Sequence, residues 1–182
     1  LQKATKSNQD NPNPASILGE YLERKNQLDS AEQHYASALK IDSKHAVSHY
    51  RMGRVLLKQN SQSKGTEHLQ KAVELEPQVP MYLEALGNEY ERQNKSLEAI
   101  NTLERLSVLQ PDRAEIYVRL GDLYKKENFF KEAVSRYWAA LSIENDNPPV
   151  HRALKELFET LNKAEQDWLL NNKGQGAVAK NP

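Results

Sequence analysis

Glycine recurs in this chain at a fixed interval of 34 residues, and this spacing limits the possible folds more than any other feature of the sequence. The four glycines are Gly19, Gly53, Gly87 and Gly121. Two further columns of residues repeat in phase with them. One column holds Asn26, Asn60, Asn94 and Asn128, and the other holds Arg24, Lys58, Arg92 and Lys126. A period of this size indicates a series of repeated supersecondary units.

Four units follow from this period, and each contains two amphipathic helices. Aligned on the glycines, the units span residues 12–45, 46–79, 80–113 and 114–147. In the third unit Leu86 directly precedes the glycine, Tyr90 follows it, and Ala99 and Leu103 come later. Apolar residues at intervals of three and four lie on one face of an α-helix. Neither helix of a unit can bury this face alone, so the units are expected to stack.

The repeat resembles the tetratricopeptide repeat, whose signature is Trp-x2-Leu-Gly-x2-Tyr followed by Ala, Phe, Ala and Pro. The third unit has Leu83, Leu86, Gly87, Tyr90, Ala99, Leu103, Leu106 and Pro111 at these positions, and the fourth has Tyr117, Leu120, Gly121, Tyr124, Ala133, Tyr137 and Ala140. The second unit departs from the pattern at Met52 and Gly65. The resemblance implies an all-α fold, a right-handed superhelical solenoid of helix-turn-helix repeats whose first helices line a concave groove.

Each repeated column has a physical reason. Glycine allows two helices to cross where a Cβ atom would collide, although it lowers helix stability by about 1 kcal/mol. Asparagine tolerates the left-handed backbone conformation that ends a helix, so the Asn column predicts the end of each first helix. The basic column lies two residues earlier, where a cation complements the negative end of the helix dipole.

The segments on either side of the repeats differ from them in character. Residues 1–11 are polar and have no helical stripe, which indicates a linker. Residues 148–171 are expected to form capping helices, one over 150–161 and a short one over 163–171. Residues 172–182 have no periodicity and are expected to form a flexible tail. The chain begins with Leu, which suggests a piece of a longer protein.

Trp138 is an unusual residue for its place in the second helix of the last unit. The other units have Ala36, Gln70 and Glu104 there. We expect Leu157, Leu161 or Trp168 of the cap to cover the indole. The alternative is an exposed patch on which another subunit or domain docks.

Composition excludes several classes of protein. Lys and Arg total 25, as do Asp and Glu, and a net charge of zero argues against general binding of nucleic acid or anionic membranes. A helical repeat that reads RNA is a weaker alternative, because such repeats carry a basic groove. Cysteine is absent, so the chain forms no disulfides. No apolar run is long enough to insert into a membrane, and the compartment stays open between cytoplasmic, periplasmic and membrane-tethered.

The sequence offers no convincing catalytic, cofactor or metal site. His45 and His49 are four residues apart, a spacing that can place two imidazoles on one helix face as metal ligands. No third ligand accompanies them, and His49 occupies a packing position that Leu83 and Tyr117 fill in other units. We therefore expect a structural role for both histidines. Phosphate-binding loops, nucleophile elbows and cofactor fingerprints are absent too, so we predict that the chain is not an enzyme and takes no cofactor.

The predicted groove is formed by the positions of the first helices that the core does not use. Its expected partner-binding residues are Tyr50, Arg51, Arg54, Lys58, Met81, Glu84, Asn88, Arg119 and Asp122. Arginine and tyrosine are frequent anchors of interfaces. The equally weighted alternative is that Arg51 and Arg54 pair with neighbouring glutamates. The chain is thus predicted to be a scaffold that holds a protein or peptide partner, or else a spacer or oligomerisation module, including a homo-oligomer.

Overall fold

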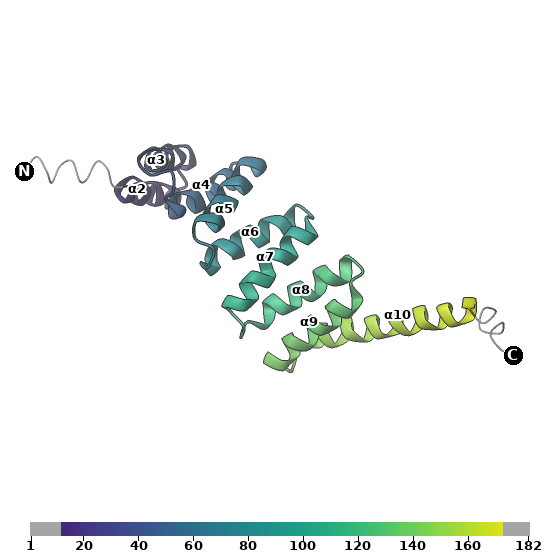
Figure 1. The fold of residues 1–182 in the computed structure, drawn as a ribbon. Coiled ribbons are helices and arrows are strands. Elements are labelled where there is room, and N and C mark those ends of the chain that lie inside the picture. Colours follow the sequence, from purple (N-terminus) through teal and green to yellow (C-terminus); the bar gives the residue numbers. More distant parts are fainter. Residues whose placement is uncertain (1–11, 173–182) are drawn as a thin grey trace, which may run out of the picture. The chain divides into compact units, whose positions relative to one another are not determined.

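The computed structural model describes the backbone of residues 12–172 and the side chains as far as residue 163 (Figure 1). Every regular element in this part of the chain is an α-helix, as the sequence analysis expected. The chain divides into two compact units, one ending at Leu109 and one beginning at Gln110. The predicted linker and most of the predicted tail lie outside the described residues.

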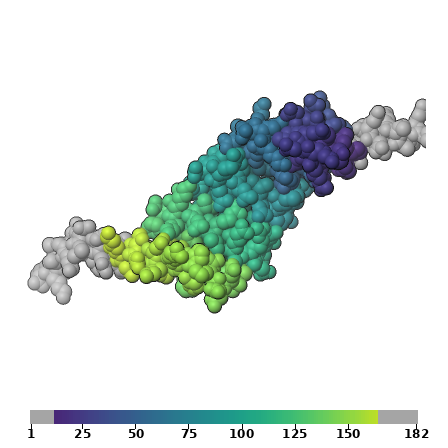
Figure 2. All heavy atoms as spheres, turned by 180° about the vertical axis from the view of Figure 1, so that it is seen from behind, coloured from purple at the N-terminus to yellow at the C-terminus, as the bar shows by residue number. Residues whose placement is uncertain are grey.

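The first unit consists of three helix pairs. They are α2 (Asn13–Arg24) with α3 (Leu28–Ile41), α4 (Ala46–Lys58) with α5 (Gln62–Leu75), and α6 (Pro80–Arg92) with α7 (Ser96–Leu109). In Figure 2, where all heavy atoms are drawn, the first and second pairs (purple to blue) form one packed body. The second unit holds a fourth pair, α8 (Ala114–Lys126) with α9 (Phe130–Ile143), followed by α10 (Pro148–Asn172).

The asparagine column ends the first helices as predicted. Asn26, Asn60, Asn94 and Asn128 have φ angles of 58°, 62°, 56° and 63°, and they are the described non-glycine residues with positive φ. The amide of the next residue then bonds back to the last turn of the helix, as from Gln27 to the Leu22 carbonyl at 2.9 Å and from Ser61 to the Leu56 carbonyl at 2.8 Å. This is the pattern that closes a helix with a left-handed residue.

The glycine column marks close helix crossings, but the four crossings are not equally tight. A Cβ at Gly53 would lie 2.8 Å from the backbone oxygen of Gly65, and one at Gly121 would lie 2.5 Å from the ring of Tyr137. At Gly87 the nearest atom would be a methyl carbon of Leu103 at 3.2 Å. The second repeat therefore has its two backbones in contact, which explains why it carries glycine at both Gly53 and Gly65.

The core is built from the small and large residues that recur in the second helices. In the first two repeats Ala31 and Tyr35 of α3 pack with Met52, Val55 and Leu56 of α4. The second unit has its own cluster, which is made of Ala133, Tyr137 and Leu141 of α9 with Val150, Leu154 and Leu157 of α10. The apolar face of α10 thus covers α9 in the way that α4 covers α3.

The predicted pair of capping helices is instead one continuous helix, α10, which runs from Pro148 to Asn172 (Figure 1). Asn162 is in phase with the asparagine column but lies inside this helix. Lys155 stands where the repeats have glycine, so a second helix has no close crossing point at which to fold back. Without that packing, an asparagine alone does not end the helix.

The expected cover over Trp138 is not formed by Leu157. Leu157 packs into the apolar cluster between α9 and α10, and 53% of Trp138 remains exposed. The side chain of Trp168 lies outside the part of the chain whose side chains are described.

A basic hollow between the first helices

A hollow of about 280 Å³ lies where the first helices of the first three repeats face one another. It contains five of the nine residues that the sequence analysis assigned to the groove, all from α4 and the start of α6. The lining residues are Glu20, Glu23, Arg24, Tyr50, Arg51, Arg54, Lys58 and Met81. The glutamates and Arg24 come from α2.

Glu20 lies at the rim of the hollow and forms two ion pairs there. Its carboxylate lies 2.8 Å from the guanidinium of Arg24, four residues away on the same helix, and 2.7 Å from that of Arg51 on α4. The sequence-based alternative that Arg51 pairs with a neighbouring glutamate therefore describes the unliganded protein. Pairs of this kind at a surface contribute little to stability, about 0–1 kcal/mol, so a competing carboxylate can displace one.

Glu23 forms the buried floor of the hollow. Lys58 donates to its carboxylate at 2.8 Å, Arg54 lies 3.1 Å away, and the Tyr35 hydroxyl donates at 3.3 Å. Burial by itself raises the pKa of Glu23, but the Lys58 hydrogen bond and the charges of Arg54 and Lys58 outweigh it and hold the pKa below its usual value. Burial and the nearby Glu23 charge raise the pKa of Tyr35 to about 12.

The charges in the hollow do not balance. Arg24, Arg51, Arg54 and Lys58 supply four positive charges against two negative charges from Glu20 and Glu23, which leaves an excess of two. Arg54 and Lys58 keep 39% and 45% of their side-chain surface exposed although both contact Glu23. The hollow therefore retains cationic surface that can attract an anionic group.

Tyr50 and Met81 play different parts in the hollow. Tyr50 is 7% exposed, its ring lies 5.0 Å from that of Tyr82, and the Arg54 guanidinium lies 5.5 Å above it. Tyr50 is thus a wall that orients Arg54 and offers little contact area of its own. Met81 is exposed at the edge of the hollow and provides apolar surface there.

The remaining predicted groove residues are not among those that line this hollow. Glu84 and Asn88 are on α6, and Arg119 and Asp122 are on α8 in the second unit. The Tyr137 hydroxyl donates to the Asp122 carboxylate at 2.6 Å, which ties α8 to α9. Asp122 therefore has a structural contact within its own repeat.

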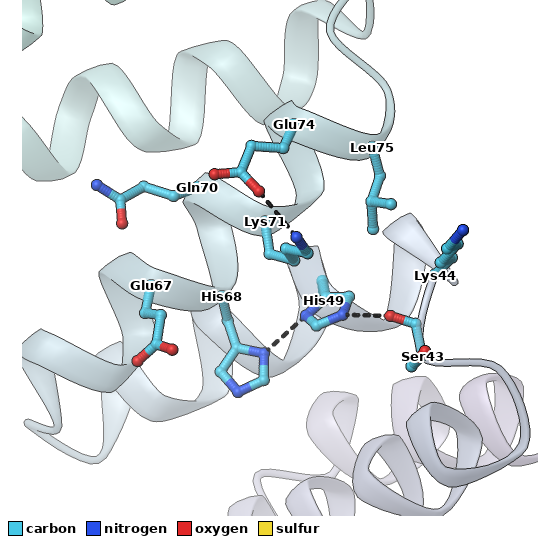
Figure 3. Close-up of a pocket in the computed structure, with 9 residues that line it drawn as sticks. All are labelled: Ser43, Lys44, His49, Glu67, His68, Gln70, Lys71, Glu74 and Leu75. Atoms are coloured by element: carbon cyan, nitrogen blue, oxygen red, sulfur yellow. Dashed lines mark hydrogen bonds and ion pairs between the residues drawn. The ribbon is translucent and has the colours of Figure 1, made fainter.

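A second hollow, of about 640 Å³, contains a histidine pair that the sequence analysis did not predict (Figure 3). His49 on α4 and His68 on α5 point toward each other, and their Nδ1 atoms are 3.0 Å apart. His45 does not join them, because its ring bonds to Ser48 and Asn13. No column signals this pair, since the positions equivalent to His68 hold His34, Thr102 and Arg136.

The tautomers of this pair follow from its outer contact. Nε2 of His49 lies 3.0 Å from the Ser43 carbonyl, so it carries a proton and donates it. In the neutral ring Nδ1 of His49 is then an acceptor, and His68 donates to it. Burial and the neighbouring His49 lower the pKa of His68, while Glu67 and Glu32 act in the opposite direction.

Other site types do not stand out in the part of the chain that the structure describes. Within it, no group of three or more His, Cys, Asp or Glu side chains is arranged to hold a metal ion. None of the described helices is long and apolar enough to cross a lipid bilayer.

Comparison with known proteins supports the fold. No family model and no curated protein sequence matches this chain. Among solved structures, the chain is similar to YrrB, a TPR protein described as having an unusual peptide-binding site, with a TM-score of 0.74 and 20% identity over 88% of this chain and 83% of that one. It is also similar to MamA, with a TM-score of 0.69 and 21% identity over 94% of this chain and 98% of that one. The chain therefore has the helical-repeat fold of TPR proteins, as the sequence motifs implied.

Proposed function

We propose that this chain is a non-catalytic interaction scaffold whose basic hollow binds an acidic segment of a partner protein. The observation that carries the proposal is the excess of two positive charges held around the buried Glu23. Arginine and lysine side chains that are already oriented lose less conformational freedom when they meet a carboxylate. The description of YrrB as a peptide-binding protein of this fold supports the same class of function.

The partner segment is expected to combine one or two carboxylates with an apolar side chain. A carboxylate that displaces Glu20 from Arg51 gains a forked guanidinium contact. An apolar residue beside it would pack on Met81, which is 52% exposed next to the basic residues. Arg54 and Lys58 stay on Glu23 and add a favourable potential without losing their present partner.

The test compares acidic peptides with neutral ones. Octapeptides that contain Glu and Leu, and matched peptides with Gln in place of Glu, are titrated into the full chain by calorimetry at low and moderate salt. The acidic peptides should bind at least tenfold more tightly, and the difference should shrink as salt is added. Equal binding of both peptide sets would overturn the proposal.

Neutral variants locate the site better than charge reversal does. Replacing Arg54 by glutamate would place a carboxylate against Glu23, so loss of binding could reflect loss of folding. Arg51→Gln with Arg54→Gln should abolish the preference for acidic peptides. The matched control is Lys64→Gln with Lys71→Gln on α5, which removes the same charge outside the hollow and should leave binding unchanged.

The alternative role as an oligomerisation module has a separate signature. It predicts that the chain associates with itself as its concentration rises, without any added peptide. Sedimentation of the wild type and of the Arg51→Gln, Arg54→Gln variant over a hundredfold concentration range distinguishes this role from peptide binding.

A further inference from the structure

The charged side chains of the basic hollow form two clusters of the same composition. At the rim, Glu20 lies between Arg24 and Arg51, at 2.8 Å and 2.7 Å. The floor repeats this composition, because Glu23 lies between two cations of α4, at 3.1 Å and 2.8 Å. Each cluster thus has two cations around one carboxylate and retains one positive charge.

The two excess charges meet on one face of α4. Arg51 belongs to the rim cluster and Arg54 to the floor cluster, and residues three apart lie on the same face of a helix. Both arginines line the hollow, and the Arg54 guanidinium is held 5.5 Å above the ring of Tyr50. A group that lies between Arg51 and Arg54 therefore borders both clusters and meets both excess charges.

A single carboxylate uses only half of this potential. When it binds Arg51 it replaces Glu20, so one ion pair is exchanged for another and an excess charge remains in the floor cluster. Two carboxylates can supply two charges, but they belong to separate side chains, and each loses conformational freedom when it is ordered in a hollow of about 280 Å³.

A phosphoryl group supplies both charges at one point. It carries about −1.5 to −2 charges at pH 7 and three strong acceptor oxygens. The forked donors of arginine match phosphate geometry, so one group can accept from the guanidinium groups of both Arg51 and Arg54. The excess of two positive charges in the hollow equals the charge of the phosphoryl dianion.

We propose that the basic hollow takes a phosphorylated serine or threonine of the partner protein, held between Arg51 and Arg54. The proposal rests on the function proposed above, since the phosphorylated residue belongs to the acidic segment that the hollow binds. An unmodified hydroxyl brings no charge to the two clusters, whereas the phosphoryl group neutralises both. Phosphorylation of the partner therefore switches the interaction on.

The probes are octapeptides that contain Leu and differ at one place, which holds phosphoserine, serine or two adjacent glutamates. They are titrated into the full chain by calorimetry. The two-glutamate peptide is the matched control, because it carries a similar charge on two side chains. The phosphoserine peptide should bind at least tenfold more tightly than the two-glutamate peptide, and the serine peptide should bind most weakly.

Removing one excess charge tests the charge match. Arg24→Gln leaves the rim cluster neutral, and it should weaken binding of the phosphoserine peptide at least fivefold. The side chain of Arg24 is 77% exposed, so this change should not affect folding. The matched control is Lys64→Gln, which removes one charge from an exposed position on α5 outside the hollow and should bind as the wild type does.

Three results would overturn this proposal. They are equal binding of the phosphoserine and two-glutamate peptides, phosphoserine binding that neither Arg24→Gln nor Arg51→Gln with Arg54→Gln weakens, and binding of inorganic phosphate alone as tightly as the phosphoserine peptide. If the first result came with tighter binding of glutamate peptides than of their glutamine counterparts, the proposed function would stand without the phosphoryl group. Failure of every charged peptide to bind better than its neutral counterpart would overturn both.

Discussion

The ammonium group of Lys58 on α4 lies 2.8 Å from the carboxylate of Glu23 on α2, although the two residues are 35 positions apart. Lys58 belongs to the basic column, which the sequence analysis explained by the helix dipole alone. The contact gives this lysine a second role, because it joins the first repeat to the second across the floor of the hollow. Replacing Glu23 should therefore lower the stability of the chain and alter binding in the hollow.

Glu23→Gln should destabilise the chain by about 2 kcal/mol, because the charged hydrogen bond from Lys58 is lost in a buried place. The pKa of Glu23 is lowered in the folded state, so its contribution is complete above the unfolded value of 4.5 and is lost as the pH falls through the folded pKa. Urea unfolding at pH 7 and pH 3.5 checks this. The difference in unfolding free energy between variant and wild type should be smaller at pH 3.5 than at pH 7. An equal difference at both pH values would contradict this prediction.

His68→Gln should make stability less dependent on pH between neutrality and mild acid. The pKa of His68 is lowered in the folded state, so below pH 6.5 the unfolded chain binds the proton more readily and the wild type loses stability. Glutamine can still donate to Nδ1 of His49. Between pH 7.5 and pH 5.5 the free energy of unfolding should fall less for the variant than for the wild type, and an equal fall for both would contradict this prediction.

Asn94→Gly should leave the melting temperature unchanged or raise it slightly, because glycine adopts the φ of 56° at no steric cost. Asn94→Val should lower stability by about 1–2 kcal/mol, since a β-branched residue resists the left-handed conformation. Thermal unfolding of both variants followed by circular dichroism is the measurement. Equal melting temperatures would mean that backbone conformation does not explain the asparagine column.

Gly53→Ala should be more damaging than Gly87→Ala. At Gly53 the new methyl group meets the Gly65 backbone oxygen at 2.8 Å, which cannot move without separating the helices, and a cost of about 2 kcal/mol or more is expected. At Gly87 the Leu103 side chain can shift from 3.2 Å, so alanine should cost less than about 1 kcal/mol. Gly87→Leu should still be severe. Denaturant midpoints for the three variants compare how tightly the helices pack at the two crossings. A larger loss for Gly87→Ala than for Gly53→Ala would be inconsistent with this geometry.

Much of the fold was predictable because the residues that end the first helices and allow helices to cross recur in every repeat. The glycine and asparagine columns predicted where helices cross and where they end, since both residues answer local backbone requirements. The same logic failed at Asn162, which stays helical in α10. The missing information lies seven residues upstream of Asn162, where Lys155 takes the place of the glycine at which a second helix would have crossed.

The candidate site was predictable only in part. Five groove residues line the basic hollow, because first-helix positions repeat in phase. Tyr50 was expected to contact a partner but is buried against Tyr82, and no periodicity shows which aromatic residue finds a neighbour. The His49–His68 pair joins two positions that are unremarkable in their own columns. A repeat pattern shows which positions face a neighbouring helix, but it does not show which particular side chains contact each other there.

Helix α10 closes the face of α9 on which a further repeat would stack. Val150, Leu154 and Leu157 of α10 occupy the surface that a following first helix would use. A second copy that stacked on α9 end to end would first have to displace α10 and expose these three side chains to water. The burial of this face therefore works against filament growth through α9.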